Sequence, residues 1–88
     1  MSAPSPDAAE HLAMLRGAAS AFLSRAAGSD LVIRGVRDGT VGLPPGETPE
    51  DVIREAQRAA RADRRRAKEL LKHAARISKT LGLLGETA

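Results

Sequence analysis

From Thr48 to Leu81 the chain reads TPEDVIREAQRAARADRRRAKELLKHAARISKTL, and this stretch decides the fold. Thr48 is suited to cap a helix, Pro49 suits its first position, and the two acidic residues that follow favour its first turn. After Pro49 neither Gly nor Pro occurs until Gly82 and Gly85, which predict the end of the helix. The predicted helix is about 50 Å long at 1.5 Å per residue, longer than a compact domain of this size is wide. Another surface must therefore cover it.

One face of this predicted helix carries a line of mostly apolar residues spaced alternately three and four apart, which we call the seam. Such spacing is typical of coiled-coil packing. Asp63 is its one charged residue, and it predicts either a solvated stretch where the seam separates or an ion pair with an Arg across an interface. Leu84 extends the line toward the C-terminus. The seam predicts the oligomer interface of a homodimer, formed by Ile53, Ala56, Ala60, Ala67, Leu70, Ala74, Ile77 and Leu81.

The opposite face of the same helix is basic. Its cations recur every three or four residues, and Arg64 and Arg66 widen the stripe at its centre. A stripe of this kind suits a phosphate backbone, although it would also suit an acidic protein partner, or be the ordinary solvated face of an amphipathic helix. With one Phe and no Trp or Tyr, the chain lacks the aromatic platforms that bind single strands. The predicted nucleic-acid-binding residues are Arg54, Arg58, Arg61, Arg65, Lys68, Lys72, Arg76 and Lys79.

A first helix is expected over residues 6–27, after a short disordered tail at residues 1–5. Pro6 and Asp7 favour its start, and Gly28 predicts its end. Apolar residues follow at helical spacing, at Leu12, Leu15, Ala19, Phe22 and Ala26. Because these apolar residues lie on one face, the sequence predicts an amphipathic helix.

Between the two predicted helices, residues 31–37 are rich in β-branched side chains, and Asp38 and Gly39 form a common hairpin turn. We therefore expect a β-hairpin pairing residues 31–37 with 40–43, the alternative being an irregular loop. The fold class predicted is mainly α, a helix, a short β-hairpin and a long amphipathic helix assembled as a homodimer, and narrowly α+β if the hairpin forms. Residues 6–82 would make a single helix–hairpin–helix domain, with a C-terminal tail at 83–88. This order of elements resembles small antitoxins of the Phd/YefM type, without the strand with which that family begins.

Composition limits what such a chain can do. Leu, Ile, Val and Phe make up only 18 of 88 residues, close to the lower bound for a self-sufficient core, so self-association is expected. The absence of Cys excludes thiolate chemistry, and no apolar run is long enough to span a bilayer. The start lacks the pattern of a secretory signal, which together with the lack of Cys predicts a cytoplasmic protein. Glu69 and His73 could share a helix face, but half a metal site is less common than an ordinary surface His.

No catalytic constellation is visible, so we expect no enzyme, no cofactor, no metal site, no small-molecule substrate and no membrane partner. The sequence predicts a small non-catalytic nucleic-acid-binding accessory protein or regulator, of the kind that accompanies toxins or is encoded by phages. The alternatives are an adaptor or inhibitor whose basic helix docks on an acidic protein, or a structural or assembly component of a phage.

Overall fold

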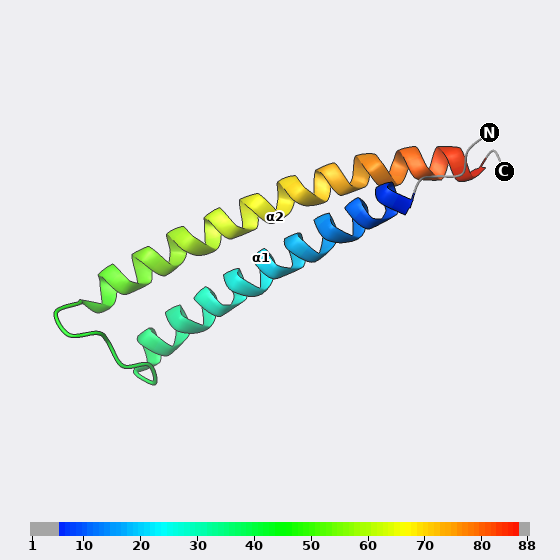
Figure 1. Ribbon diagram of the computed structural model, residues 1–88. Helices are drawn as coiled ribbons and strands as arrows, with labels where there is room; N and C mark the ends of the chain where they lie inside the picture. The colour runs from blue at the N-terminus through cyan, green and yellow to red at the C-terminus, as the bar shows by residue number, and fades with distance from the viewer. Residues whose placement is uncertain (1–5, 87–88) are drawn as a thin grey trace.

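The computed structural model describes residues 6–86, with the side chains of residues 7–82. The described residues form two helices, α1 (Pro6–Asp38) and α2 (Pro49–Glu86), which lie side by side and antiparallel, joined by one loop (Figure 1). The chain forms a rod of 64 × 18 × 15 Å. Its radius of gyration is 19.1 Å, where a compact domain of this length would have about 12 Å.

The contact between the helices is built mainly from alanine. On both helices, the residues that face the other helix are spaced three and four apart. The buried alanines of each helix lie seven residues apart. Ile33 is the only larger apolar side chain in the buried set, and no large side chain is fully buried among the described residues. The small residues allow the two helix axes to approach closely. The buried apolar residues are Ala19, Ala26, Ile33, Ala60, Ala67 and Ala74.

The prediction of a helix, a β-hairpin and a helix is wrong: the described chain is a helical hairpin without strands. Residues 31–37, predicted as the first strand, are the last turns of α1. The heptad spacing explains why, since Ser29, Ile33 and Val36 continue the line of residues that faces α2. Burying them outweighs both the β propensity of this segment and the cost of about 1 kcal/mol for the helical Gly28. Without a hairpin, the resemblance to the Phd/YefM antitoxins loses its basis.

The Asp38–Gly39 pair ends α1 instead of turning a hairpin. Gly39 has a φ of +80°, which a glycine adopts without strain. The backbone N–H of Thr40 donates to Asp38 Oδ1 over 3.2 Å, and the Thr40 hydroxyl donates to the same oxygen over 2.7 Å. The chain then folds back, so that the Val41 N–H donates to the Gly35 carbonyl at 3.0 Å. Val41 thereby covers the last turn of α1.

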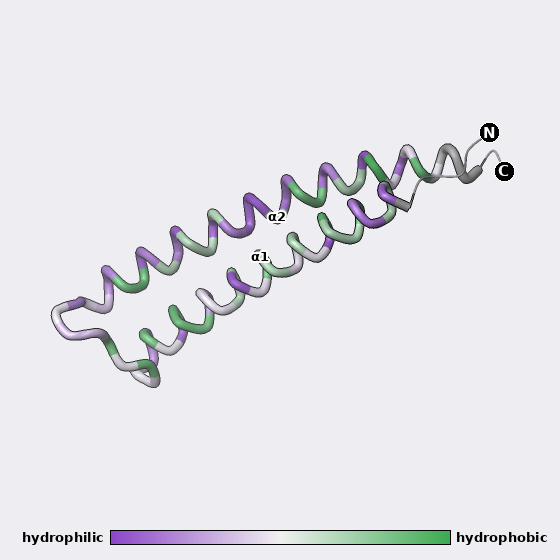
Figure 2. Tube along the Cα trace, viewed as in Figure 1, coloured by the Kyte–Doolittle hydropathy of each residue, from purple (hydrophilic) through white to green (hydrophobic). Residues whose placement is uncertain are grey.

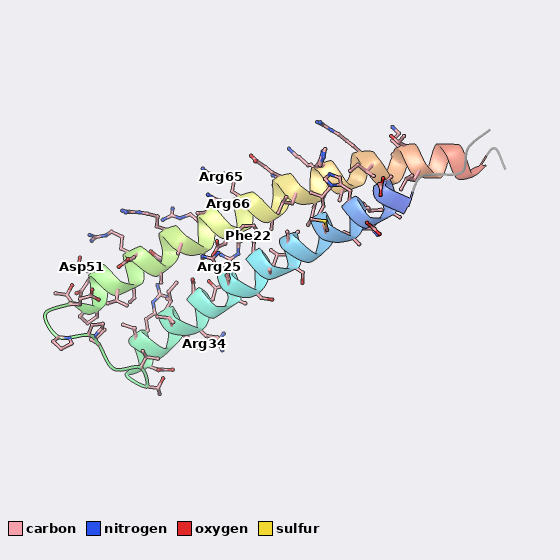
Figure 3. The ribbon with its side chains drawn as sticks, in the orientation of Figure 1. Phe22, Arg25, Arg34, Asp51, Arg65 and Arg66 are labelled. Atoms are coloured by element: carbon pink, nitrogen blue, oxygen red, sulfur yellow. The ribbon has the colours of Figure 1, made fainter. Side chains whose placement is uncertain are left out.

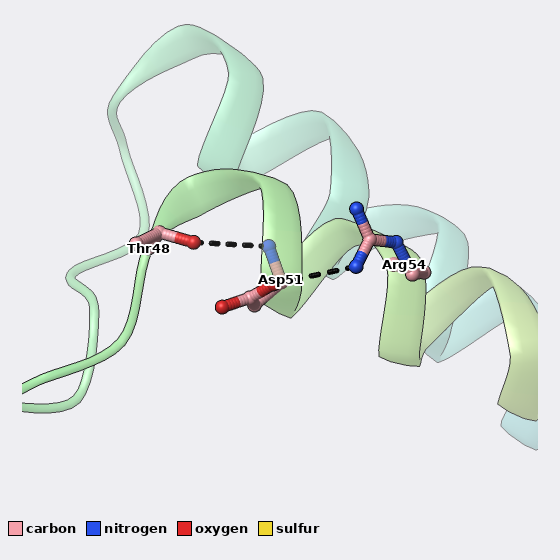
Figure 4. Close-up of polar contacts among 3 residues, drawn as sticks. All are labelled: Thr48, Asp51 and Arg54. Atoms are coloured by element: carbon pink, nitrogen blue, oxygen red, sulfur yellow. Dashed lines mark hydrogen bonds and ion pairs between the residues drawn. The ribbon is translucent and has the colours of Figure 1, made fainter.

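The start of α2 follows the sequence-based expectation. Thr48 Oγ1 accepts a hydrogen bond from the Asp51 N–H over 3.2 Å, and Arg54 pairs with the Asp51 carboxylate at 3.5 Å (Figure 4). Its end does not, because α2 continues through Gly82 to Glu86. The backbone of residues 83–86, predicted as part of a tail, is therefore helical. The side chain of Leu84 and the tail predicted at residues 1–5 lie outside the described residues.

Candidate nucleic-acid interface

The eight predicted nucleic-acid-binding residues share the side of α2 that faces away from α1. All eight are exposed, whereas the seam positions between them are buried or half-buried. Figure 3 shows Arg65 projecting from α2 away from α1, while Phe22 lies between the two helices. The periodicity of the sequence therefore located this basic face correctly relative to the seam.

Most cations of the basic face are not neutralised by a neighbouring acid. Arg54 pairs with Asp51, and Arg61 donates to the Gln57 carbonyl at 3.4 Å. Among the described residues, the other six side chains form neither an ion pair nor a hydrogen bond, and these are Arg58, Arg65, Lys68, Lys72, Arg76 and Lys79. They extend over about 32 Å of helix at 1.5 Å per residue. Positive charge of this density and exposure produces a local potential of several kT.

Two arginines that the sequence assigned to the widened stripe turn toward α1 instead. Arg64 pairs with Asp30 of α1. The Arg66 guanidinium lies 5.7 Å from the centre of the Phe22 ring, and the Arg25 guanidinium lies at the same distance. Contacts of this type between a cation and an aromatic ring are worth about 0.5–1 kcal/mol at exposed sites. Arg64 and Arg66 therefore join the two helices and are not available to a ligand in the way that Arg65 is.

Asp63 pairs with an Arg of α1 in the same chain, whereas the sequence-based interpretation expected such an Arg across an interface. Its side chain is nearly buried, and one carboxylate oxygen lies 3.9 Å from Nε of Arg25 on α1. The Arg25 side chain is mostly exposed, so solvent screens this pair and it adds little stability. Its position favours one alignment of the helices, because a shift along the axis would leave Asp63 among alanines.

The predicted oligomer-interface residues lie against α1 of the same chain. Ala60, Ala67 and Ala74 are buried there, and the larger members of the seam are half-buried. The length of α2 indicated that another surface must cover the seam. In the single chain, that surface is α1. Contact between two copies through the seam stays a prediction, and it would require α1 to move away from α2.

The antiparallel arrangement also joins two histidines that sequence reasoning left apart. The rings of His11 on α1 and His73 on α2 form an edge-to-face contact with their centres 5.7 Å apart. Only the register of the helix pair brings them together, so no local sequence signal could have revealed the contact. Within the part of the chain that the structure describes, no three potential ligands gather into a metal site, and no helix is long and apolar enough to cross a membrane.

Comparisons with known proteins give no relative from which a role could be transferred. The chain matches no protein-family model, no curated protein and no solved structure.

Proposed function

We propose that this protein is a small, non-catalytic nucleic-acid-binding accessory protein that acts in the cytoplasm, using the basic face of α2 on the phosphate backbone. The observation that carries the proposal is the row of six exposed cations, from Arg58 to Lys79, whose side chains form neither an ion pair nor a hydrogen bond in the described structure. A merely solvated helix face usually mixes charges, so that neighbouring residues pair at a spacing of three or four. Between Arg58 and Lys79, the outward face of α2 carries a single acidic residue, Glu69.

The shape of the protein favours duplex over single-stranded ligands. The basic face lies along one side of a straight rod, and Phe22, the one aromatic residue of the chain apart from histidines, is held between Arg25 and Arg66. Bases therefore find no free aromatic surface on which to stack. Contacts to phosphates position a protein without reading sequence, so binding should depend weakly on base sequence.

The salt dependence of binding to duplex DNA tests the proposal. Each neutralised phosphate of B-DNA contributes about −0.9 to the slope of log K against log salt, so six contacts would give a slope of about −5. The variant Arg65→Gln/Lys72→Gln should reduce the slope by roughly 2, because it removes two contacts without adding repulsion. Arg16→Gln/Arg37→Gln, which removes the same charge from α1, is the matched control and should leave the slope unchanged.

Two outcomes would contradict the proposal. One is the absence of measurable affinity for duplex DNA or structured RNA at about 50 mM salt, conditions in which phosphate contacts are strong. That result would favour an acidic protein as the ligand of the basic face. The other is an equal loss of slope in both variants, which would show that net charge, and not the face of α2, is responsible.

A further inference from the structure

The outward side of α1 differs sharply from that of α2. Between Ala13 and Leu31 its outward positions hold three alanines, two glycines, two serines, Met14 and Leu31, and all are exposed. We call this surface the uncharged face. Met14 is 71% exposed and Leu31 is 63% exposed, the highest values among the large apolar residues that the structure describes. Figure 2 shows the same contrast, since pale and green segments dominate the middle of α1 whereas purple recurs along α2.

We propose that the uncharged face binds a second copy of this chain, with the two α1 helices antiparallel. The two-fold axis would cross α1 at the height of residue 22 along the helix, on the side opposite α2. The arrangement of charge supports this occupant. The charged residues that bound the face are acidic on one side, at Glu10, and basic on the other, at Arg34. Neither forms an ion pair within the described chain. An antiparallel copy would place each Glu10 beside the other copy's Arg34, whereas a parallel copy would place like charges together.

The apolar residues of the face have the same symmetry. Positions 10 and 34 have their midpoint at position 22, and so do positions 13 and 31. In the antiparallel pair, Leu31 of each copy therefore meets Ala13 and Met14 of the other. Between these ends the face carries only Gly, Ala and Ser, which allow the helices to approach closely. A self-complementary surface of this kind is what a two-fold interface requires.

The surface area of the single chain points to the same partner. The accessible surface is 6584 Å², whereas a compact protein of 9.2 kDa exposes about 4,900 Å². A typical interface covers about 800 Å² on each partner, so a dimer would remove a substantial part of this excess. A core made of alanines and one Ile leaves a single hairpin with little apolar burial, which a partner on the uncharged face would supplement. Because each copy's α2 lies on the far side of its α1, the two basic faces of the dimer would point in opposite directions.

Sedimentation equilibrium of the full chain tests the interface without relying on nucleic-acid binding. The expected mass is about twice that of the 9.2 kDa chain. The double variant Met14→Glu/Leu31→Glu should be monomeric and remain helical, because both side chains are exposed in the hairpin. Leu71→Glu is the matched control, since Leu71 is 43% exposed but lies on α2; it should still dimerise. A monomeric wild type, or a dimer that the double variant leaves intact, would overturn the proposal.

The direction of pairing has its own test, made simple by the absence of native Cys. A mixture of the variants Ala13→Cys and Leu31→Cys should form a mixed covalent dimer with a short thiol cross-linker. Each variant alone should form none, because two copies of position 13 would lie about 27 Å apart along the antiparallel helices. Covalent homodimers of either variant, or no mixed dimer, would show that the pairing is not the one proposed.

The charge pair at the ends of the face provides a third test. Glu10→Arg and Arg34→Glu should each weaken the dimer several-fold, because each places like charges together at both ends. The double variant Glu10→Arg/Arg34→Glu should restore the dimer to near its original affinity. If the double variant dimerises no more tightly than the single variants, the pairing of these two residues is contradicted.

Discussion

Replacing Ala67 with Leu should separate the two helices and lower the stability of the hairpin. Ala67 is 1% exposed and lies at the middle of the row of alanines by which α2 contacts α1. A Leu at this position adds three carbon atoms to a contact in which the buried residues in the middle of α1 are also alanines, Ala19 and Ala26. The added volume must be accommodated against these small residues and against Phe22, which also lies between the helices (Figure 3). The helices must move apart, or the Leu must adopt an unfavourable rotamer.

The expected loss follows from this geometry. Inserting extra methylene groups into a well-packed core typically costs about 1–3 kcal/mol. A loss of 2 kcal/mol would lower the Tm by about 8–16 °C in a chain of this size. The effect should exceed that of a simple change in helix propensity, because Leu and Ala differ there by only a few tenths of a kcal/mol. Thermal unfolding followed by circular dichroism at 222 nm measures it directly.

Ala62→Leu is the matched control, since Ala62 lies on the same helix but is exposed. Its Tm should change by no more than about 2–4 °C, because exposed substitutions usually stay within about 0.5 kcal/mol. Equal Tm values for the two variants, or a more stable Ala67→Leu, would refute the conclusion that close contact between alanines fixes the hairpin. Such a result would mean that the helices lie far enough apart to accept a Leu.

Three further predictions concern the ends of the helices. Gly35→Ala should lower the Tm despite the better helix propensity of Ala, because its Cβ would collide with Cγ2 of Val41; a higher Tm would show that Val41 does not pack there. The hydrogen bonds from Thr40 hold the pKa of Asp38 below its ordinary value of 3.8, so they stabilise the fold above that pH, and this contribution is lost as the pH falls through the lowered pKa. In Thr40→Val the carboxyl titration followed by NMR should move back toward 3.8, and an unchanged midpoint would contradict the assignment. Thr48→Ala removes the cap of α2 and should cost about 1 kcal/mol, or about 4–8 °C in Tm, whereas an unchanged Tm would show that water replaces the cap at no cost.

Local sequence was sufficient for α2 and its two faces. The Thr48 cap and the absence of Gly and Pro up to Gly82 specify where the helix begins and keep it continuous. The period of three and four places Ala60 and Ala67 on the side opposite Arg65, whatever covers them. These features depend on neighbours within one or two helical turns, and for that reason a single sequence reveals them.

Tertiary structure decided the segment from Gly28 to Asp38 and every contact between the helices. Its β-branched residues and its Asp38–Gly39 pair are locally compatible with a hairpin, and only the surface of α2, which buries Ile33, makes a helix the better solution. The pairing of Asp63 with Arg25 likewise depends on which residues the antiparallel register brings together. That register depends on the packing of the whole seam of α2 against α1 and on the loop that joins the two helices. Local propensities contain no information about it, because the energy that selects it comes from surfaces far apart in the sequence.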